Sequence, residues 1–216
     1  MLVIGAIGDG IMEVMAARRK RKPAWEELPR VPEPFEGLRD MRDRIDTGHY
    51  RAEIINGALI VSPVPVFWHE RVSQWLVRSF DGVCDANEWF GDSAGEIELP
   101  PTEDLICPDF MILRDATTMP DLESTRPLDR VLLAAEVISA SSIERDREVK
   151  PRACALAGIP LYLLVDRFTK PVTISLHSAP GEGGYGDVTT VTAGEKLRLP
   201  APFNLTLDTS SLPLPA

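Results

Sequence analysis

The sequence predicts one mixed α/β domain, in which a central β-sheet is flanked by helices. Three observations lead to this fold class. The chain has 216 residues, a length that suits a single domain, and its 44% hydrophobic and 26% charged residues are typical of a folded globular protein. Two short runs are apolar on both alternating faces, which indicates strands covered on both sides of a sheet. Between the strand-like runs lie two segments in which apolar residues have helical spacing.

The N-terminal part of the chain is predicted to lie outside the domain. We expect residues 1–22 to form a flexible extension that ends in a basic run, Arg18–Lys22, and residues 23–216 to form the single domain. A glycine cluster in residues 5–10 lacks the strand and helix context of a dinucleotide-binding loop, so we assign it no function. Four prolines from Pro23 to Pro34 predict a short helix followed by irregular chain.

The next segments predict a hairpin and a helix. His49–Pro63 is an apolar run interrupted by Asn56-Gly57, the pair favoured where both turn residues adopt a left-handed backbone conformation. An amphipathic helix follows, because apolar residues recur at helical intervals on one face from Phe67 to Phe80. We expect this helix to pack on the sheet.

The remaining strands are predicted from their apolar patterns. Gly95–Pro100 alternates glutamate with aliphatic residues, as a half-buried strand does. Leu105–Leu113 and Val131–Ile138 are apolar on both faces and predict central strands. Leu161–Asp166 predicts another buried strand, and more exposed strands are expected around the glycine-rich turn at Gly181–Gly186.

A second helix is predicted between the last two buried strands. It begins at a capping box, in which Ser141 precedes Glu144 by three residues, and it ends at Gly158. Its length corresponds to about four turns. Pro151 lies inside it, and because proline removes an intrahelical hydrogen bond we expect a kink that could reorient Lys150.

The net charge restricts the partners that the chain can bind. The chain carries 23 basic and 33 acidic side chains, a net charge of −10, and five basic and two acidic ones fall in residues 1–22. Residues 23–216 therefore carry 18 basic and 31 acidic side chains, a balance of −13. Nonspecific nucleic-acid binding draws its affinity from Lys and Arg, so a polyanion must meet a local basic patch or a bound cation.

Cysteine usage and hydropathy predict a soluble, cytoplasmic protein. The three cysteines are widely separated and have no C-x-x-C spacing for zinc or redox chemistry. No run of eighteen apolar residues occurs, so we expect no membrane-spanning helix. The basic run also follows the apolar N-terminal segment, which is the reverse of a secretory signal.

Two acidic residues are candidates for a metal site. Asp109 is the only charged residue in Leu105–Leu113, and Glu136 is the only one in Val131–Ile138. A carboxylate in a buried strand is costly unless it is paired, protonated or bound to a cation. Mg²⁺ would compensate both at once, because it takes one or two carboxylates and keeps several waters. Pro108 is compatible with a bulge or strand end that turns the next side chain into a cleft.

The nearest candidate for a catalytic cation is Lys150. Ile138 lies on the same strand face as Glu136, so no lysine follows there. Lys150 lies four residues after Asp146, at the edge of the apolar stripe of the second helix. An exposed ion pair between these two side chains is the structural alternative, and it would contribute only a few tenths of a kcal/mol.

Several segments together resemble the Uma-two family of restriction-type endonucleases, which is similar to the PD-(D/E)XK nuclease superfamily. They are Pro108-Asp109, the segment EVISASSIERDREVK from Glu136 to Lys150, AGIPLYLLVD from Ala157 to Asp166, and EIINGALIVSPVP with His69 after it. The resemblance covers most of the chain from about Trp25 onward. It implies a restriction-endonuclease-like core and hydrolysis of DNA phosphodiester bonds.

The resemblance also implies a role for each matching residue. Asp109 and Glu136 would be metal ligands, with the backbone carbonyl of Val137 as a third, and Mg²⁺ or Mn²⁺ as the cofactor. Lys150 would replace the superfamily lysine, moved from strand to helix, and would stabilise the charge that develops on the phosphate.

Two further positions match the family pattern less directly. Glu53, in the hairpin, matches an early acidic position. His69 would orient a phosphate or a water, although a histidine at such a position is more often a packing residue.

Other functions remain open on the sequence alone. Asp109 and Glu136 could instead form a structural ion-pair network. The acidic balance favours either restricted DNA substrates with a helper protein, or an inactive nuclease-fold module that binds or regulates. A phosphohydrolase acting on small nucleotides would also tolerate the acidic surface. Two cuts on a duplex would favour a homodimer.

Overall fold

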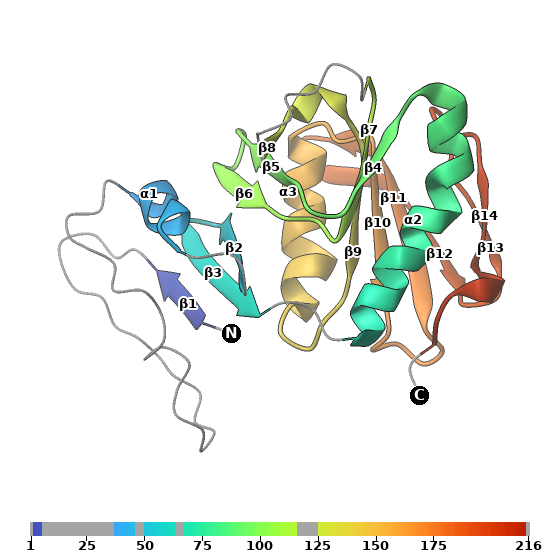
Figure 1. The fold of residues 1–216 in the computed structure, drawn as a ribbon, viewed down its shortest axis with the longest axis horizontal. Coiled ribbons are helices and arrows are strands. Elements are labelled where there is room, and N and C mark those ends of the chain that lie inside the picture. Colours follow the sequence, from blue (N-terminus) through green and yellow to red (C-terminus); the bar gives the residue numbers. More distant parts are fainter. Residues whose placement is uncertain (1, 6–36, 46–49, 64–66, 116–124, 215–216) are drawn as a thin grey trace.

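The computed structural model describes residues 2–5, 37–45, 50–63, 67–115 and 125–214. They form two six-stranded sheets, a two-stranded ribbon and three α-helices (Figure 1). In the first sheet the strand order is β1 (Leu2–Gly5), β3 (Ala58–Pro63), β2 (Tyr50–Ile55), β6 (Asp104–Ile106), β5 (Glu96–Leu99) and β8 (Thr125–Arg126). In the second it is β12 (Gly184–Thr192), β11 (Thr173–Gly181), β10 (Leu161–Asp166), β9 (Val131–Val137), β7 (Phe110–Leu113) and β4 (Phe90–Asp92).

The helices and the ribbon complete the described elements. The α-helices are α1 (Leu38–Asp43), α2 (Phe67–Asn87) and α3 (Lys150–Leu156), and the ribbon pairs β13 (Lys196–Arg198) with β14 (Thr206–Asp208). Short 3-10 turns lie at Leu128–Arg130 and Thr209–Ser211. The mixed α/β fold class is confirmed.

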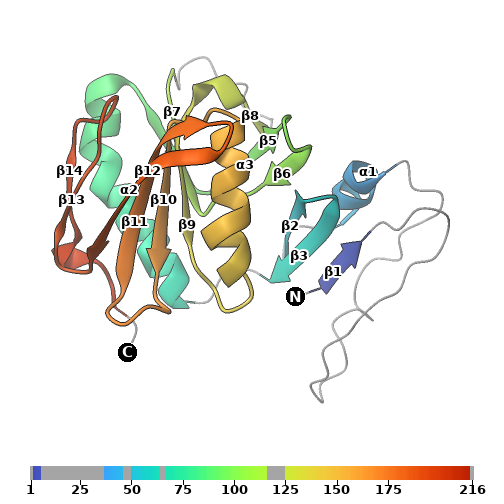
Figure 2. The ribbon, with the colours of Figure 1, turned by 180° about the vertical axis from the view of Figure 1, so that it is seen from behind.

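The second sheet lies between α2 and α3, which cover its opposite faces (Figures 1 and 2). Successive side chains of a strand point to opposite faces, so odd- and even-numbered residues of its central strands belong to different cores. Phe110, Ala135 and Leu163 pack with the apolar face of α2, whereas Ala134 and Tyr162 pack with α3. This arrangement explains why the central strands are apolar on both faces.

The predicted hairpin is confirmed as β2 and β3. Asn56 and Gly57 form the turn with φ angles of 50° and 68°, the left-handed conformation that the Asn-Gly pair accommodates. The predicted amphipathic helix is confirmed as α2, which continues to Asn87. The strands predicted at Gly95–Pro100, Val131–Ile138 and Leu161–Asp166 are β5, β9 and β10.

The prediction of one strand over Leu105–Leu113 is wrong. The segment forms two strands in different sheets, β6 and β7, joined by Cys107-Pro108-Asp109. Proline cannot donate a ladder hydrogen bond, so the strand ends there, as the position of Pro108 allowed. The chain crosses between the sheets at Asp109.

The predicted second helix differs at its start. A π-helical turn, Arg145–Val149, precedes α3, and the N–H of Lys150 donates to the carbonyl of Arg145. Pro151 has no N–H to donate to the preceding turn, which favours this wider spacing over a simple kink. The expected capping box of Ser141 and Glu144 is also absent from the contacts of the described residues. Instead, Oγ of Ser142 accepts a hydrogen bond from the backbone N–H of Ser139.

The N-terminal prediction changes in part. Residues 2–5 form β1, which pairs antiparallel with β3, so this piece of the expected extension belongs to a sheet. The remaining extension, including the basic run, and the helix predicted from Pro23 to Pro34 lie outside the described residues. Within the described segments, no helix combines the length and apolar character that a membrane crossing requires.

Candidate active site

Glu136 faces α3 from the middle of the second sheet. It lies next to the last residue of β9, beside Leu164 of β10, with its side chain against Lys150 of α3, and is 2% exposed. Strands β9 and β10 are parallel, so their carboxyl ends lie at the same edge of the sheet. In α/β sheets this edge is where ligands commonly bind.

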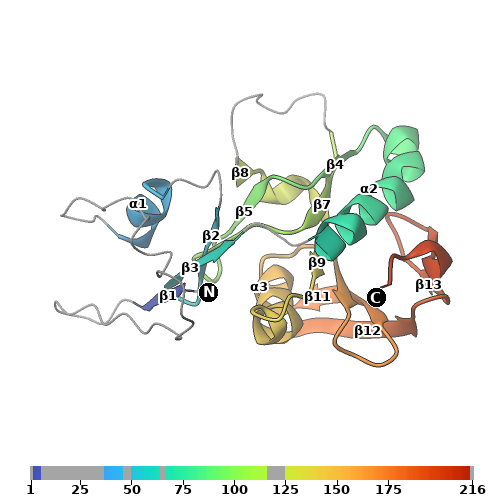
Figure 3. The same ribbon diagram turned by 60° about the horizontal axis from the view of Figure 1, so that its bottom comes forward.

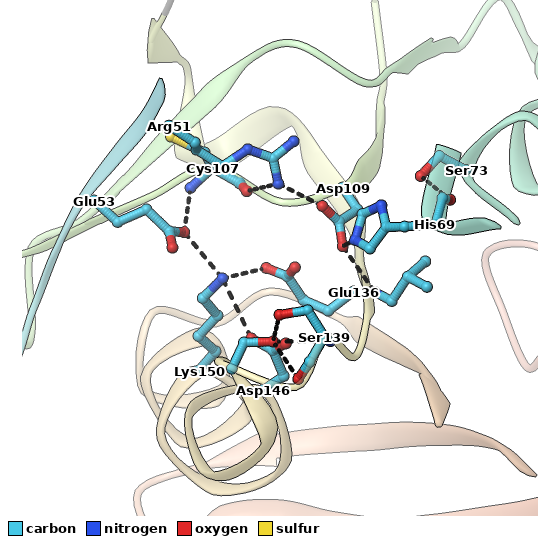
Figure 4. Close-up of polar contacts among 12 residues, drawn as sticks. Arg51, Glu53, His69, Ser73, Cys107, Asp109, Glu136, Ser139, Asp146 and Lys150 are labelled. Atoms are coloured by element: carbon cyan, nitrogen blue, oxygen red, sulfur yellow. Dashed lines mark hydrogen bonds and ion pairs between the residues drawn. The ribbon is translucent and has the colours of Figure 1, made fainter. Parts of the chain in front are cut away.

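Asp109 lies at the crossing between the two sheets and is held by three donors (Figure 4). Nε2 of His69 and the N–H of Val137 both donate to its Oδ2, each at 2.8 Å. Nη1 of Arg51 pairs with its Oδ1 and donates to the carbonyl of Cys107 at 3.2 Å. The first turn of α2, the end of β9 and strand β2 therefore fix this carboxylate.

Lys150 joins three buried acids. Its Nζ lies 2.7 Å from Oε1 of Glu136, 2.9 Å from Oε1 of Glu53 and 3.5 Å from Oδ1 of Asp146 (Figure 4). Oε1 of Glu53 also accepts the N–H of Cys107 at 2.9 Å. Cys107 is the first residue of the segment Cys107-Pro108-Asp109. Glu53 therefore connects Lys150 to the segment that carries Asp109.

One cavity brings these residues together. Its volume is about 310 Å³, and Arg51, Glu53, Asp109, Glu136 and Lys150 all contribute to its wall. The loop after β9, residues 139–142, and Arg167 after β10 complete the wall. In Figure 3, strand β9, which carries Glu136, lies between α2 and α3.

The structure thus brings together every residue that the sequence singled out. Glu53, His69, Asp109, Glu136 and Lys150 share the cavity, and so does Val137. Val137 contributes its N–H to Asp109, while its carbonyl as a metal ligand stays a prediction. His69 contacts Asp109 rather than open solvent, and its Nδ1 is buried without a hydrogen-bond partner in the described part of the chain.

Sequence reasoning missed two members of the site. Arg51 lies two residues before Glu53, and strand alternation places both on one face of β2, which was an available signal. Asp146 was considered only as an exposed partner of Lys150, but it is 2% exposed. Asp146 lies in the π-helical turn and Lys150 directly follows this turn, and both side chains are buried.

Burial and charge shift the pKa values of the site. Burial raises the pKa of Glu136 well above its usual range, and the charge of Lys150 only partly offsets this. Burial likewise raises the pKa of Asp146. For Asp109, burial acts in the same direction, but the hydrogen bond from His69 and the charge of Arg51 outweigh it and lower the pKa. Burial alone would lower the pKa of Lys150, but its acidic neighbours raise it well above the usual value.

The donor set fits a hydrated Mg²⁺ ion. Four buried carboxylates contact two full positive charges, Arg51 and Lys150, so the contact network contains more acids than bases. Across the described ranges, no three His, Cys, Asp or Glu side chains are arranged to hold a metal. Asp109 and Glu136 nevertheless offer hard oxygen atoms to one cavity, and Mg²⁺ commonly needs only one or two carboxylates.

The mixed sheets and the acid-lysine cavity at the strand ends define a restriction-endonuclease-like nuclease fold. A crystal structure described as a putative nuclease of the DUF820 family, from Anabaena variabilis, is similar to this chain with a TM-score of 0.60. The match covers 74% of this chain and 88% of that one at 14% identity, and at this identity it supports the fold alone. A search of curated proteins finds no match.

The family follows from the sequence match. The model of the Uma2 family, described as "Putative restriction endonuclease", matches residues 35–210, and the chain belongs to this family. Membership supports a nuclease, which is a hydrolase of phosphodiester bonds with a nucleic-acid substrate.

Proposed function

We propose that the chain is a Mg²⁺-dependent endonuclease that hydrolyses DNA phosphodiester bonds, with Mn²⁺ as an alternative cofactor. The observation that carries the proposal is the convergence of Asp109, Glu136 and Lys150 on one cavity. Family membership supports the same reaction class.

Asp109 and Glu136 are the proposed metal ligands. Bound there, a divalent cation supplies a Lewis acid that polarises the phosphoryl group and lowers the pKa of a water. His69 and Arg51 hold Asp109 in its ionised form, because both favour the negative charge. Glu53 acts as a positioning residue, since it contacts both Lys150 and the backbone before Asp109.

Lys150 is proposed to act on the phosphate. Its ammonium group is fixed by three acids and adds positive charge at the cavity, where a reacting phosphate gains negative charge. Preorganised charge of this kind needs no rearrangement during the reaction, which is why it accelerates phosphoryl chemistry.

Cleavage of labelled DNA tests the proposal. Purified protein is incubated with single-stranded, duplex and branched DNA and Mg²⁺ or Mn²⁺. We expect cleavage, and we expect Asp109→Asn and Glu136→Gln each to reduce its rate by about 10²-fold or more. Asp129→Asn is the control, because Asp129 is exposed in the turn before β9. Cleavage of none of these DNAs, or cleavage undiminished by Asp109→Asn, would reject the proposal.

A second candidate function is an inactive module that keeps the nuclease fold. The ion pairs favour it, because Arg51 and Lys150 already neutralise Asp109 and Glu136 in part. Calorimetric titration with Mg²⁺ and Mn²⁺ separates the two functions. A saturable site that Glu136→Gln removes supports the endonuclease, and no heat of binding in the unchanged protein supports the module.

A further inference from the structure

An aromatic and cationic surface borders the cavity. Arg167, in the loop after β10, lines the cavity wall. Its guanidinium group lies 5.1 Å from the ring centre of Trp68 and 5.1 Å from that of Phe168. Phe67 precedes Trp68 at the start of α2. We call these four residues, together with Arg71, the aromatic rim.

The rim exposes apolar rings to solvent. Phe67 is 77% exposed and Phe168 is 37% exposed, and both rank among the few large hydrophobic side chains of the described residues that are exposed. Trp68, in contrast, is half-buried against the core below α2, and its Nε1 donates to the carbonyl of Pro213 at 3.1 Å. The rim therefore has a fixed base, Trp68 with Arg167 over its ring, and two outer rings, Phe67 and Phe168, that are partly open to solvent.

The rim also carries positive charge in a chain whose net charge is −10. The guanidinium group of Arg71 lies 5.8 Å from the ring centre of Phe67, so each exposed ring has an arginine over it. Stacked guanidinium groups keep N–H donors at their edges, which suit phosphate oxygens. This is the local basic patch that a polyanion needs in order to approach an acidic protein.

We propose that the aromatic rim binds single-stranded DNA beside the cleavage site. Unpaired bases stack on Phe67 and Phe168, and the phosphates between them contact Arg71 and Arg167, which leads the strand into the cavity. Base stacking needs an open face on each base, and the bases of a duplex are already stacked on each other. This inference rests on the proposed function, which identifies the ligand as DNA. It adds that the protein prefers a single strand to a duplex.

A binding assay without divalent metal tests the rim separately from catalysis. A fluorescent single strand of twelve nucleotides and the matching duplex are titrated with the full chain in EDTA, and anisotropy is measured. We expect tighter binding of the single strand. Phe67→Ala and Phe168→Ala should each weaken it by about tenfold, because each variant loses the stacking of one base.

Two further variants complete the design. Phe90→Ala is the matched control, since Phe90 is 44% exposed in β4, beyond the opposite end of the 21-residue helix α2. It should leave the affinity unchanged. Arg167→Ala should weaken binding and reduce its salt dependence, because one phosphate contact is lost.

The outcomes distinguish the rim from the nuclease. Equal or tighter binding of the duplex, or single-strand binding that neither phenylalanine variant weakens, overturns the rim proposal even if the protein cleaves DNA. Ring-dependent binding of the single strand supports it even if no metal produces cleavage. Absence of nucleic-acid binding overturns it too, and the exposed rings then fit an apolar protein partner instead.

Discussion

Removal of the charge at Lys150 is the most direct way to perturb the balance between acidic and basic side chains in the site. Lys150→Met keeps a flexible apolar stem of similar shape but leaves Glu53, Glu136 and Asp146 without the cation that all three contact. Their side chains are 5%, 3% and 2% exposed, so the little water that reaches them from the cavity compensates poorly for the lost partner. Breaking a buried ion pair costs about 3–5 kcal/mol. For a chain of this size, that cost lowers Tm by about 6–20 °C.

The loss should depend on pH in a defined direction. Without the lysine, the folded-state pKa values of Glu136 and Asp146, which burial already raises, rise further above their unfolded values. The folded protein then binds more protons than the unfolded chain, so its stability decreases as pH rises. The difference between the variant and the unchanged protein should therefore be larger at pH 8 than at pH 5.

Urea unfolding followed by tryptophan fluorescence measures this difference. Arg152→Met is the matched control, because Arg152 is an exposed residue of the same helix, two positions after Lys150. The control should change the free energy of unfolding by less than about 0.5 kcal/mol. A Lys150→Met protein as stable as the control at pH 8 would refute the reasoning, since it would mean that the three acids do not need the lysine.

Two other variants test separate parts of the structure. Arg51→Ala frees Oδ1 of Asp109, so calorimetry should show that the affinity for Mg²⁺ rises by about tenfold. Arg39→Ala is the control, because it removes only an exposed ion pair with Glu98 and should leave this affinity unchanged. An unaltered affinity in Arg51→Ala would show that the arginine does not compete with the cation. His177 packs between two tyrosine rings, and burial lowers its pKa, so the unchanged protein should lose stability as pH falls through about 6.5 toward that lowered value. His177→Phe should flatten the dependence of Tm on pH in that window, and an identical dependence in both proteins would contradict this account.

The negative net charge of the chain is compatible with membership of a nuclease family, because the acidic and basic side chains around the site lie in different places. The acids of the cavity lie inside, where Arg51 and Lys150 contact them. Arginines of the aromatic rim lie at the surface, where a phosphate can reach them. A protein with a negative net charge can thus present a small positive surface at the place where a strand would enter.

Local patterns in the sequence predicted most of the elements around the site. The Asn56-Gly57 turn, the stripe of α2 and the doubly apolar run of β9 each depend on the preferences of neighbouring residues, which act within a few positions of the chain. The same runs marked Asp109 and Glu136, because each is a single charge among apolar residues. Glu53 and His69 followed only from the family resemblance.

The sequence by itself determined which charged residues would be unfavourable to bury. The tertiary structure decided which hydrogen bonds and ion pairs compensate that unfavourable free energy. Pro108 signalled a strand end, but only the assembled sheets show that the chain crosses between them at Asp109. Arg51 and Asp109 meet across 58 positions, and Glu53 and Cys107 across 54. Contacts of this kind depend on how the sheets and helices pack. The residues around each partner in the sequence give no information about the other partner, so local patterns cannot predict such contacts.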